Sequence, residues 1–243
     1  MLAAWDRAKN ANDTRRQIFA VSGLTTLPLT LLSDQPRLRS IADLRSSDRI
    51  AMPTSSAPQM YVLQMAAEKT FGDYQRFKDQ VSVLSPTDAL TALLGGNGAI
   101  AAYFASPPYT QIALKDPKIH QILNSEQVIG GKASFLILGA TRAYIAAHPK
   151  IAQAVDEAMD EAARVIRDDP TRAARIFLTH EPSKALDAAD IAAVLTANKD
   201  AFGSAVEGIQ AFADFMGRHG ALKTPPQSWK EIVAPSLLNS PSS

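Results

Sequence analysis

Three times between residues 50 and 110 this chain repeats one local pattern, in which an apolar strand ends, a turn rich in Ser, Thr and Pro follows, and a helix begins. The turns are Thr54–Pro58, Ser85–Thr87 and Ser106–Pro108. Proline suits the start of a helix because its φ is already helical and its missing N–H needs no partner there. Strands and helices that alternate in this way up to residue 140 predict an α/β fold with mostly parallel strands.

The clearest instance lies within Asp48–Gly72. Arg49–Met52 is predicted to form a short buried strand, and Pro58 to start a mostly covered helix that ends at Gly72. Between them, Pro53–Ser56 is predicted to form a tight turn rich in hydroxyl groups. Because free N–H groups and the positive end of the helix dipole face such a turn, we expect it to form one wall of a crevice for an anionic or polar ligand.

The other expected elements follow the same kinds of signal. Further strands are predicted at Gln17–Ser22 and Leu27–Ser33, split by Gly23, and at Gln80–Leu84, Ala99–Phe104, Ile119–Asn124 and Ser134–Ala140. Helices are predicted at Met1–Lys9, Ser40–Arg45, Pro86–Leu94, Ser106–Lys115, Pro149–Asp168, Thr171–Thr179, Ala188–Asn198 and Ser204–His219. The carboxyl-terminal third is therefore helical, and it must pack around the sheet or onto a second one.

Composition excludes several classes of function. The 25 basic and 24 acidic residues leave a net charge of +1, whereas a nucleic-acid-binding surface needs a strong basic excess. No stretch approaches about 18 consecutive apolar residues, so no membrane-spanning helix is predicted. The absence of cysteine excludes disulfides, thiolate metal sites and cysteine nucleophiles. At 243 residues the chain can bury a large core in one domain or two lobes.

No set of residues predicts catalysis, a metal site or a bound cofactor. The four histidines are scattered, and none has the H-x-x-x-H spacing of a metal-binding helix. The Gly95–Gly98 run follows a helix and opens a strand, which is the reverse of a dinucleotide-binding loop, so we expect a helix stop. No serine lies in a G-x-S-x-G elbow. Neighbouring carboxylates such as Asp156 and Glu157 are expected on a solvated helix face.

The candidate ligand-binding residues lie in the turns. The carboxyl ends of parallel strands share one edge of a sheet, so turns that follow such strands can converge on one crevice. The turns after Met52 and Phe104 are favoured over the Ser85 turn, although Ser-Pro at a helix start is also ordinary capping. Lys132, in the hinge-like break Gly130–Lys132, either pairs with an anionic ligand or stays solvated, as most lysines do.

Three longer runs resemble one protein family. SIADLRSSDRIAMPTSSAPQMYVLQMAAEKTFG resembles the second-lobe opening of periplasmic substrate-binding proteins of the nitrate/sulfonate/taurine class of ABC importers. TDALTALLGGNGAIAAYFASPPYTQIAL is similar to that family's next helix–strand–helix. IGGKASFLILGATRAYIAAHPKIAQAVDEAMDEA is similar to its return strand and the helix after it. The order and spacing of the runs carry the resemblance, which covers roughly residues 2–233.

The resemblance implies a fold of the periplasmic binding protein type II kind, in which two α/β lobes joined by a hinge close over a small ligand. Lobe two would comprise residues 39–127, and lobe one residues 1–38 with residues 128–243. The implied ligand contacts are Thr54, Ser55, Ser56, Ser106, Pro107 and Ser134, with Lys132 as a candidate cation.

The same resemblance implies a function in import. The protein would be a periplasmic monomer that binds a small anionic or polar solute, such as nitrate, a sulfonate, taurine or a pyrimidine, and delivers it to a membrane permease. It would have no catalytic activity, no cofactor and no metal, and it would not bind nucleic acid. Two alternatives are open, namely an enzyme of pyrimidine metabolism on the same scaffold and a ligand-sensing module attached to a regulatory partner.

The amino terminus departs from the family pattern. Met1–Asn10 lacks the basic and apolar regions of a signal peptide and resembles the tail of an amphipathic helix. Members of the family begin with a leader and a strand–helix–strand that supplies the ligand wall of lobe one. We therefore expect lobe one to be incomplete in this chain.

Overall fold

The computed structural model describes residues 1–239, which form two compact units. The central unit is Pro28–Gly131, and the discontinuous unit combines Met1–Leu27 with the described part of Lys132–Ser243. The central unit begins before residue 39, the predicted start of lobe two. The reason is that β2 (Thr30–Ser33), a strand expected in lobe one, pairs within the central sheet.

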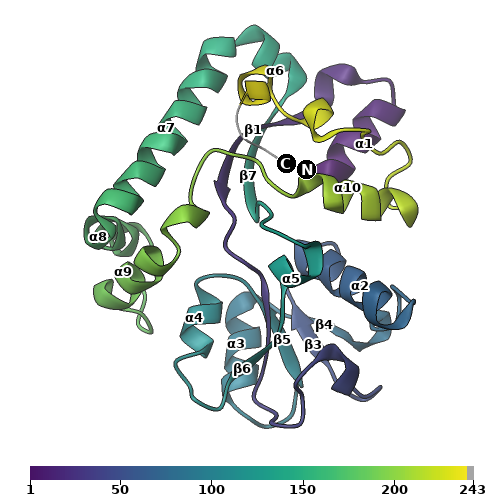
Figure 1. Cartoon of the computed structure of the whole chain (residues 1–243), viewed down its shortest axis with the longest axis vertical. Helices are drawn as coiled ribbons and strands as arrows, with labels where there is room; N and C mark the ends of the chain where they lie inside the picture. Colours follow the sequence, from purple (N-terminus) through teal and green to yellow (C-terminus); the bar gives the residue numbers. More distant parts are fainter. Residues whose placement is uncertain (240–243) are drawn as a thin grey trace. The chain divides into compact units, whose positions relative to one another are not determined.

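The central unit is built on a five-stranded sheet in the order β4-β3-β5-β2-β6 (Figure 1). Besides β2, its strands are β3 (Ile50–Met52), β4 (Val81–Val83), β5 (Ala102–Ala105) and β6 (His120–Asn124). β3 pairs in parallel with β4 and β5, whereas β2 pairs antiparallel with β5 and β6. The sheet is thus mixed rather than mostly parallel, because β2 runs against its neighbours.

Helices cover this sheet, and those that start at Pro58 and Pro86 begin and end where the sequence predicts. The helix predicted at Ser106–Lys115 is shorter, and the one that starts at Ser125 was not predicted. They are α2 (Pro58–Phe71), α3 (Pro86–Leu94), α4 (Tyr109–Ala113) and α5 (Ser125–Ile129), with the 3-10 turns η2 (Ile41–Asp43) and η3 (Lys78–Gln80). α2 ends at Gly72, which has a φ of 72° and donates its N–H to the Glu68 carbonyl. Ala89 and Leu93 of α3 pack with Tyr103 of β5 in a core where each of them is at most 1% exposed.

The discontinuous unit contains an antiparallel pair, β1 (Ile18–Thr25) and β7 (Leu136–Thr141). Its helices are α1 (Leu2–Asn10), α6 (Arg142–Ala147), α7 (Pro149–Asp168), α8 (Pro170–His180), α9 (Ala188–Ala197) and α10 (Ile209–Arg218), with the 3-10 turns η1 (Thr14–Arg16), η4 (Lys199–Ala201), η5 (Trp229–Ile232) and η6 (Pro235–Asn239). The predicted strand break at Gly23 is wrong, because β1 runs through this glycine. Gly23 donates its N–H to the Ser204 carbonyl at 2.6 Å, so it marks a close backbone approach instead.

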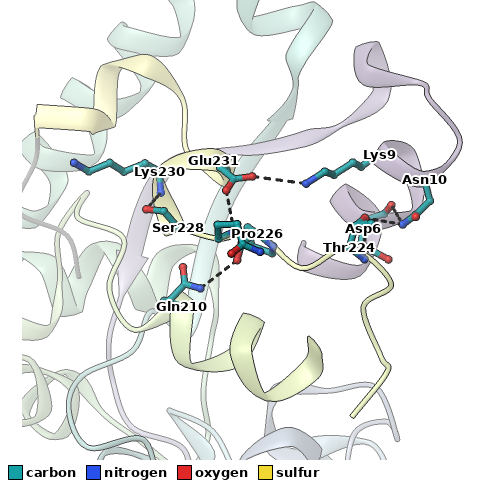
Figure 2. Close-up of polar contacts among 10 residues, drawn as sticks. Asp6, Lys9, Asn10, Gln210, Thr224, Pro226, Ser228, Lys230 and Glu231 are labelled. Atoms are coloured by element: carbon teal, nitrogen blue, oxygen red, sulfur yellow. Dashed lines mark hydrogen bonds and ion pairs between the residues drawn. The ribbon is translucent and has the colours of Figure 1, made fainter. Parts of the chain in front are cut away.

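One buried carboxylate ties a carboxyl-terminal loop of this unit to α1 (Figure 2). Asp6 is 4% exposed and accepts hydrogen bonds from the N–H of Lys223 at 3.1 Å and the N–H of Thr224 at 2.8 Å. The Thr224 hydroxyl donates to the same carboxylate at 3.0 Å, and Asn10 Nδ2 donates to that hydroxyl at 3.0 Å. The contact joins positions 218 residues apart, so it fixes α1 against the end of the chain.

β7 exposes large apolar side chains. Leu136 is 47% exposed and Leu138 is 40% exposed. In the part of the chain that the structure describes, β7 pairs with β1 alone, so its other edge is open. The apolar segment Ser134–Ala140, from which this strand is predicted, is typical of a buried strand, yet these two leucines are partly exposed to water. An open apolar edge of this kind invites pairing with another chain.

We expect the double substitution Leu136→Thr with Leu138→Thr to reduce non-specific association of the monomer at high protein concentration, at little cost in stability. Threonine suits a strand, and side chains that are nearly half exposed lose only part of the free energy of full burial, about 1 kcal/mol each or less. Size-exclusion chromatography with light scattering, at rising protein concentration, measures the association. The matched control is Leu31→Thr with Leu32→Thr, where both leucines are 0% exposed and unfolding should become easier by several times that amount. Unchanged self-association in the β7 variant would contradict the expectation.

Candidate functional site

Strands of the central unit end together at one edge of the sheet. β3, β4 and β5 are parallel, and β6 runs the same way because β5 and β6 are both antiparallel to β2. Each of β3, β4, β5 and β6 leads into a helix, so the amino termini of α2, α3, α4 and α5 lie along this edge (Figure 1). The turns Thr54–Ser56 and Ser106–Pro107 follow adjacent strands, and the fold therefore brings them to the same edge.

The turn before α2 presents exposed hydroxyl groups at the start of a 14-residue helix. Thr54, Ser55 and Ser56 are all exposed. Thr54 Oγ1 lies 3.2 Å from Ser56 Oγ and accepts a hydrogen bond from the Ser56 N–H at the same distance. The cap residue is Ala57, whose side chain accepts no hydrogen bond from the first helical turn. Ala57 therefore supplies no oxygen that would offset the positive end of the α2 dipole. This favours the binding of an anion at the turn.

The turn before α3 is already engaged. Ser85 Oγ accepts a hydrogen bond from the Asp88 N–H at 3.2 Å and donates to Asp88 Oδ2 at 2.7 Å. Ser85 is thus a helix cap, which is the structural role that its sequence context favours over ligand binding.

The turn before α4 leads to Tyr109, which the sequence analysis did not single out, and Tyr109 lies beside Thr87 of the predicted Ser85–Thr87 turn. The Ser106 carbonyl accepts from the Thr110 N–H at 3.2 Å, and the Pro107–Pro108 peptide bond is cis. Tyr109 Oη lies 3.5 Å from Thr87 Oγ1, so the starts of α3 and α4 meet at this edge. Neither Thr87 nor Tyr109 belongs to a recognisable motif, and the signal that could have found them is their place directly after the helix-starting prolines.

Lys132 and Ser134 lie in the discontinuous unit and bond to a downstream segment of the same unit. Lys132 is exposed, and its Nζ donates to the Asp200 carbonyl at 3.2 Å. Ser134 Oγ accepts from the Glu207 N–H at 2.9 Å and lies 3.5 Å from the Ala205 carbonyl oxygen. These bonds span 68 to 73 positions, so the sequence holds no local signal for them.

A partly buried ion pair fixes the strand that leads into the α2 turn. Asp48 is 8% exposed and accepts from Arg37 Nη2 at 2.5 Å and from the Arg45 N–H at 2.7 Å. Burial opposes ionisation of Asp48, but these hydrogen bonds and the charges of both arginines hold the pKa of its carboxyl below the usual value. Gln80 Nε2 donates to the carbonyls of Arg45 and Asp48 at 2.8 and 3.0 Å. These bonds fix the entry to β3, the strand that ends at Met52 and leads into the Thr54–Ser56 turn.

The edge offers neutral hydrogen-bond donors rather than a titrating pair. Burial, with a smaller effect of Tyr109, raises the pKa of Tyr103 well above its usual value, so this phenol stays protonated in the core. Among residues 1–239, no three His, Asp or Glu side chains are grouped as metal ligands. The arrangement can bind and orient a polar ligand through hydroxyls and the α2 dipole.

In the discontinuous unit, the partly buried carboxyl of Asp156 in α7 has a raised pKa. Burial is the main cause, the nearby Ser22 and Ser204 act in the opposite direction, and the charges of Asp160 and Glu157 add to the rise.

No protein-family profile and no curated protein sequence matches this chain. Solved structures do match it. The periplasmic aliphatic sulphonate binding protein SsuA from Escherichia coli has a TM-score of 0.67 and 18% identity, over 94% of this chain and 72% of that protein. The alkanesulfonate-binding protein SsuA from Xanthomonas axonopodis pv. citri, bound to MOPS, has a TM-score of 0.67 and 19% identity, over 91% of this chain and 73% of that protein.

A lower similarity extends to an enzyme. The desulfurization enzyme DSZB has a TM-score of 0.52 and 12% identity, over 98% of this chain and 82% of that protein.

Within the described residues, the helices are all too short or too polar to cross a membrane. At these levels of identity the comparisons establish architecture, and the architecture is the α/β fold of the periplasmic binding proteins.

Proposed function

We propose that this protein is the solute-binding component of an ABC importer and that it binds a small organic anion, with sulfonates as the first candidates. The observation that carries the proposal is the exposed hydroxyl turn Thr54–Ser56 at the start of α2, where the cap residue supplies no oxygen. The similarity to two sulfonate-binding proteins supports this ligand class. In this proposal the partner is a membrane permease, the compartment is the periplasm, and the protein acts as a monomer without chemistry of its own.

The chemistry of the turn suits an oxyanion. A sulfonate, nitrate or carboxylate oxygen accepts hydrogen bonds from hydroxyl groups and is stabilised by the partial positive charge at a helix amino terminus. Thr54, Ser55 and Ser56 supply the hydroxyls, and Ser106 with Pro107 form the neighbouring wall at the same sheet edge. Lys132 and Ser134 are positioned by bonds within the discontinuous unit, and Lys132 Nζ has further N–H donors beside the one that bonds the Asp200 carbonyl.

We expect Ser55→Asp to weaken binding of the anionic solute about tenfold or more without lowering the melting temperature. The new carboxylate repels an anion at the turn, while an acidic residue beside a helix amino terminus is itself favourable for the fold. A thermal shift screen of nitrate, taurine, alkanesulfonates and uracil identifies the solute, and isothermal titration calorimetry then measures the affinity of both proteins.

The matched control is Ser46→Asp, which adds the same charge to an exposed serine elsewhere in the central unit. It should leave the affinity unchanged. The proposal fails if no compound of the panel stabilises the protein. It also fails if both aspartate variants weaken binding equally, since the effect would then reflect net charge rather than the turn.

An enzyme is the second candidate, and the similarity to the desulfurization enzyme DSZB favours it. The discriminating assay is desulfurization of biphenyl-2-sulfinic acid, the compound bound in one DSZB structure. Turnover above a protein-free blank would favour the enzyme, whereas saturable binding without turnover supports solute transport.

A further inference from the structure

A cavity of about 730 Å³ lies wholly within the discontinuous unit. Its walls come from α1, the start of β1, α6, the start of α7, and the segment that contains η5 and η6. The volume falls within the range of small-molecule sites in proteins. The cavity contains no residue of the Thr54–Ser56 turn, so it is separate from the proposed solute site.

The inner wall of the cavity is apolar. Trp5 and Val233 are each 2% exposed, and Ile145 is 8% exposed. Phe19 of β1 and Ala152 of α7 complete this surface. Aromatic and aliphatic walls of this kind bind the apolar body of a ligand through burial of its surface.

Lys9, Arg142 and Lys230 line the same cavity, and among the described residues only Lys9 of these three has an acidic partner. Lys9 Nζ lies 3.7 Å from Glu231 Oε2 (Figure 2). It also lies 4.5 Å from the centre of the Trp5 ring. Glu231 is engaged further, because its Oε1 accepts from the Gln227 N–H at 2.8 Å. The charge of Lys9 is therefore already offset by the single carboxylate of the lining.

Arg142 and Lys230 supply uncompensated positive charge. Neither has a carboxylate within 4.0 Å in the portion of the chain described by the structure. The Arg142 guanidinium lies 6.0 Å from the centre of the Phe19 ring, and Lys230 Nζ lies 5.8 Å from the centre of the Trp229 ring. Both cations are exposed, and Arg142 lies beside Phe19, an aromatic residue of the cavity wall.

We propose that this cavity binds an amphiphilic organic anion, a medium-length alkyl carboxylate or sulfonate, whose head lies between Arg142 and Lys230 and whose chain lies against Trp5, Phe19 and Ile145. The two cations attract the anionic head, since charge-assisted hydrogen bonds to guanidinium and ammonium groups are stronger than those between neutral groups. The apolar wall gives the site its preference for a long hydrocarbon body over a small polar solute.

The test uses the full chain and four ligands of equal chain length. Decanoate and decanesulfonate are the anionic probes, 1-decanol is the neutral control, and decyltrimethylammonium is the cationic control. Calorimetry should give each anion a cavity site, separate from any binding at the Thr54–Ser56 turn, with affinity about tenfold above that of the alcohol, and no binding of the cation. The fluorescence of Trp5 should change with the same midpoint, because its ring forms part of the wall.

Single substitutions test whether the anions bind in this cavity. Arg142→Gln and Lys230→Gln should each weaken anion binding several-fold while leaving alcohol binding unchanged. Lys184→Gln, which removes an exposed lysine outside the cavity, should change neither. Ala146→Trp places a large ring on an exposed position of the lining and should abolish binding of both anion and alcohol.

The proposal is overturned if the anions bind no more tightly than the alcohol, or if Lys184→Gln weakens them as much as Arg142→Gln does. It is also overturned if Ser55→Asp abolishes decanesulfonate binding while Arg142→Gln does not, because the ligand would then occupy the α2 turn. Loss of binding in Arg142→Gln with normal binding in Ser55→Asp supports the cavity, whatever the fate of the proposed transport function.

Discussion

Replacing Gly23 with alanine is expected to lower the free energy of unfolding by about 3 kcal/mol or more. A Cβ at this position would lie 2.0 Å from the Ala205 carbonyl oxygen and 2.9 Å from its carbon, which are both backbone atoms. The N–H of Gly23 itself donates to the Ser204 carbonyl at 2.6 Å. The two segments cannot stay bonded and also make room for a methyl group, so β1 must separate from residues 204–205.

The cost should be large because the opposing segment is held from other sides. Ser134 Oγ lies 3.5 Å from the Ala205 carbonyl, and Asp160 Oδ1 accepts from the Ser204 N–H at 3.3 Å. Urea unfolding followed by circular dichroism measures the change. Gly203→Ala is the matched control, since a Cβ there meets nothing within 4 Å and the effect should stay within about 0.5 kcal/mol. Equal destabilisation by the two variants would show that loss of glycine flexibility, rather than the clash, is responsible.

Elements whose ends are encoded locally could be predicted from the sequence. The Ser40 and Asp43 capping box forms as expected, with the Ser40 N–H donating to Asp43 Oδ2 at 2.9 Å. The helix that it opens is only the 3-10 turn η2, because the Arg45 N–H is used by the buried Asp48 carboxylate. The capping box determines where this helix begins. The contact between Arg45 and Asp48 determines where it ends.

Features set by distant partners could not be predicted. α5 starts where Ser125 exchanges hydrogen bonds with Leu29, its N–H donating to the Leu29 carbonyl and its Oγ accepting from the Leu29 N–H. These residues are 96 positions apart, and no local pattern announces their contact. The same limit hid the reversed direction of β2, which depends on strands that follow it in the chain.

In the candidate site too, residues with a local sequence signal could be predicted, whereas the contacts of residues with distant partners could not. The Thr54–Ser56 turn was found because a strand, a hydroxyl-rich turn and a helix start are adjacent in sequence. The roles of Lys132 and Ser134 within the discontinuous unit depend on residues 200–207, so their sequence context could not indicate them. The cavity in the discontinuous unit draws its walls from both ends of the chain and was not anticipated at all.

The second large effect is expected at Asp6, where Asp6→Asn should lower the free energy of unfolding by about 2 kcal/mol at pH 7. Asp6 Oδ1 accepts from the Thr224 N–H and hydroxyl, and Asp6 Oδ2 accepts from the Lys223 N–H (Figure 2). An asparagine side chain must turn its NH₂ group toward one of these donors, whichever way it is oriented, so one buried donor loses its acceptor. The control is Asp13→Asn, whose carboxylate is 40% exposed and forms an ion pair with the exposed Arg16, and which should change stability by less than about 1 kcal/mol.

The Asp6 effect should depend on pH in a direction fixed by its pKa. Burial opposes ionisation, but the hydrogen bonds from Thr224 and Lys223 outweigh it and lower the pKa of the Asp6 carboxyl below its ordinary value. The folded state therefore holds this proton less tightly than the unfolded chain, so the contribution of Asp6 is complete above the unfolded pKa of about 4 and disappears as the pH falls toward the folded value. Urea unfolding of the wild type and Asp6→Asn at several pH values between 7 and 3 should show a constant difference down to about pH 5 and a shrinking one below about pH 4. Other carboxylates titrate equally in both proteins and cancel in this comparison. A difference that stays the same at pH 3 would mean that the asparagine acts through packing, and that the Asp6 charge does not hold α1 to the carboxyl-terminal loop.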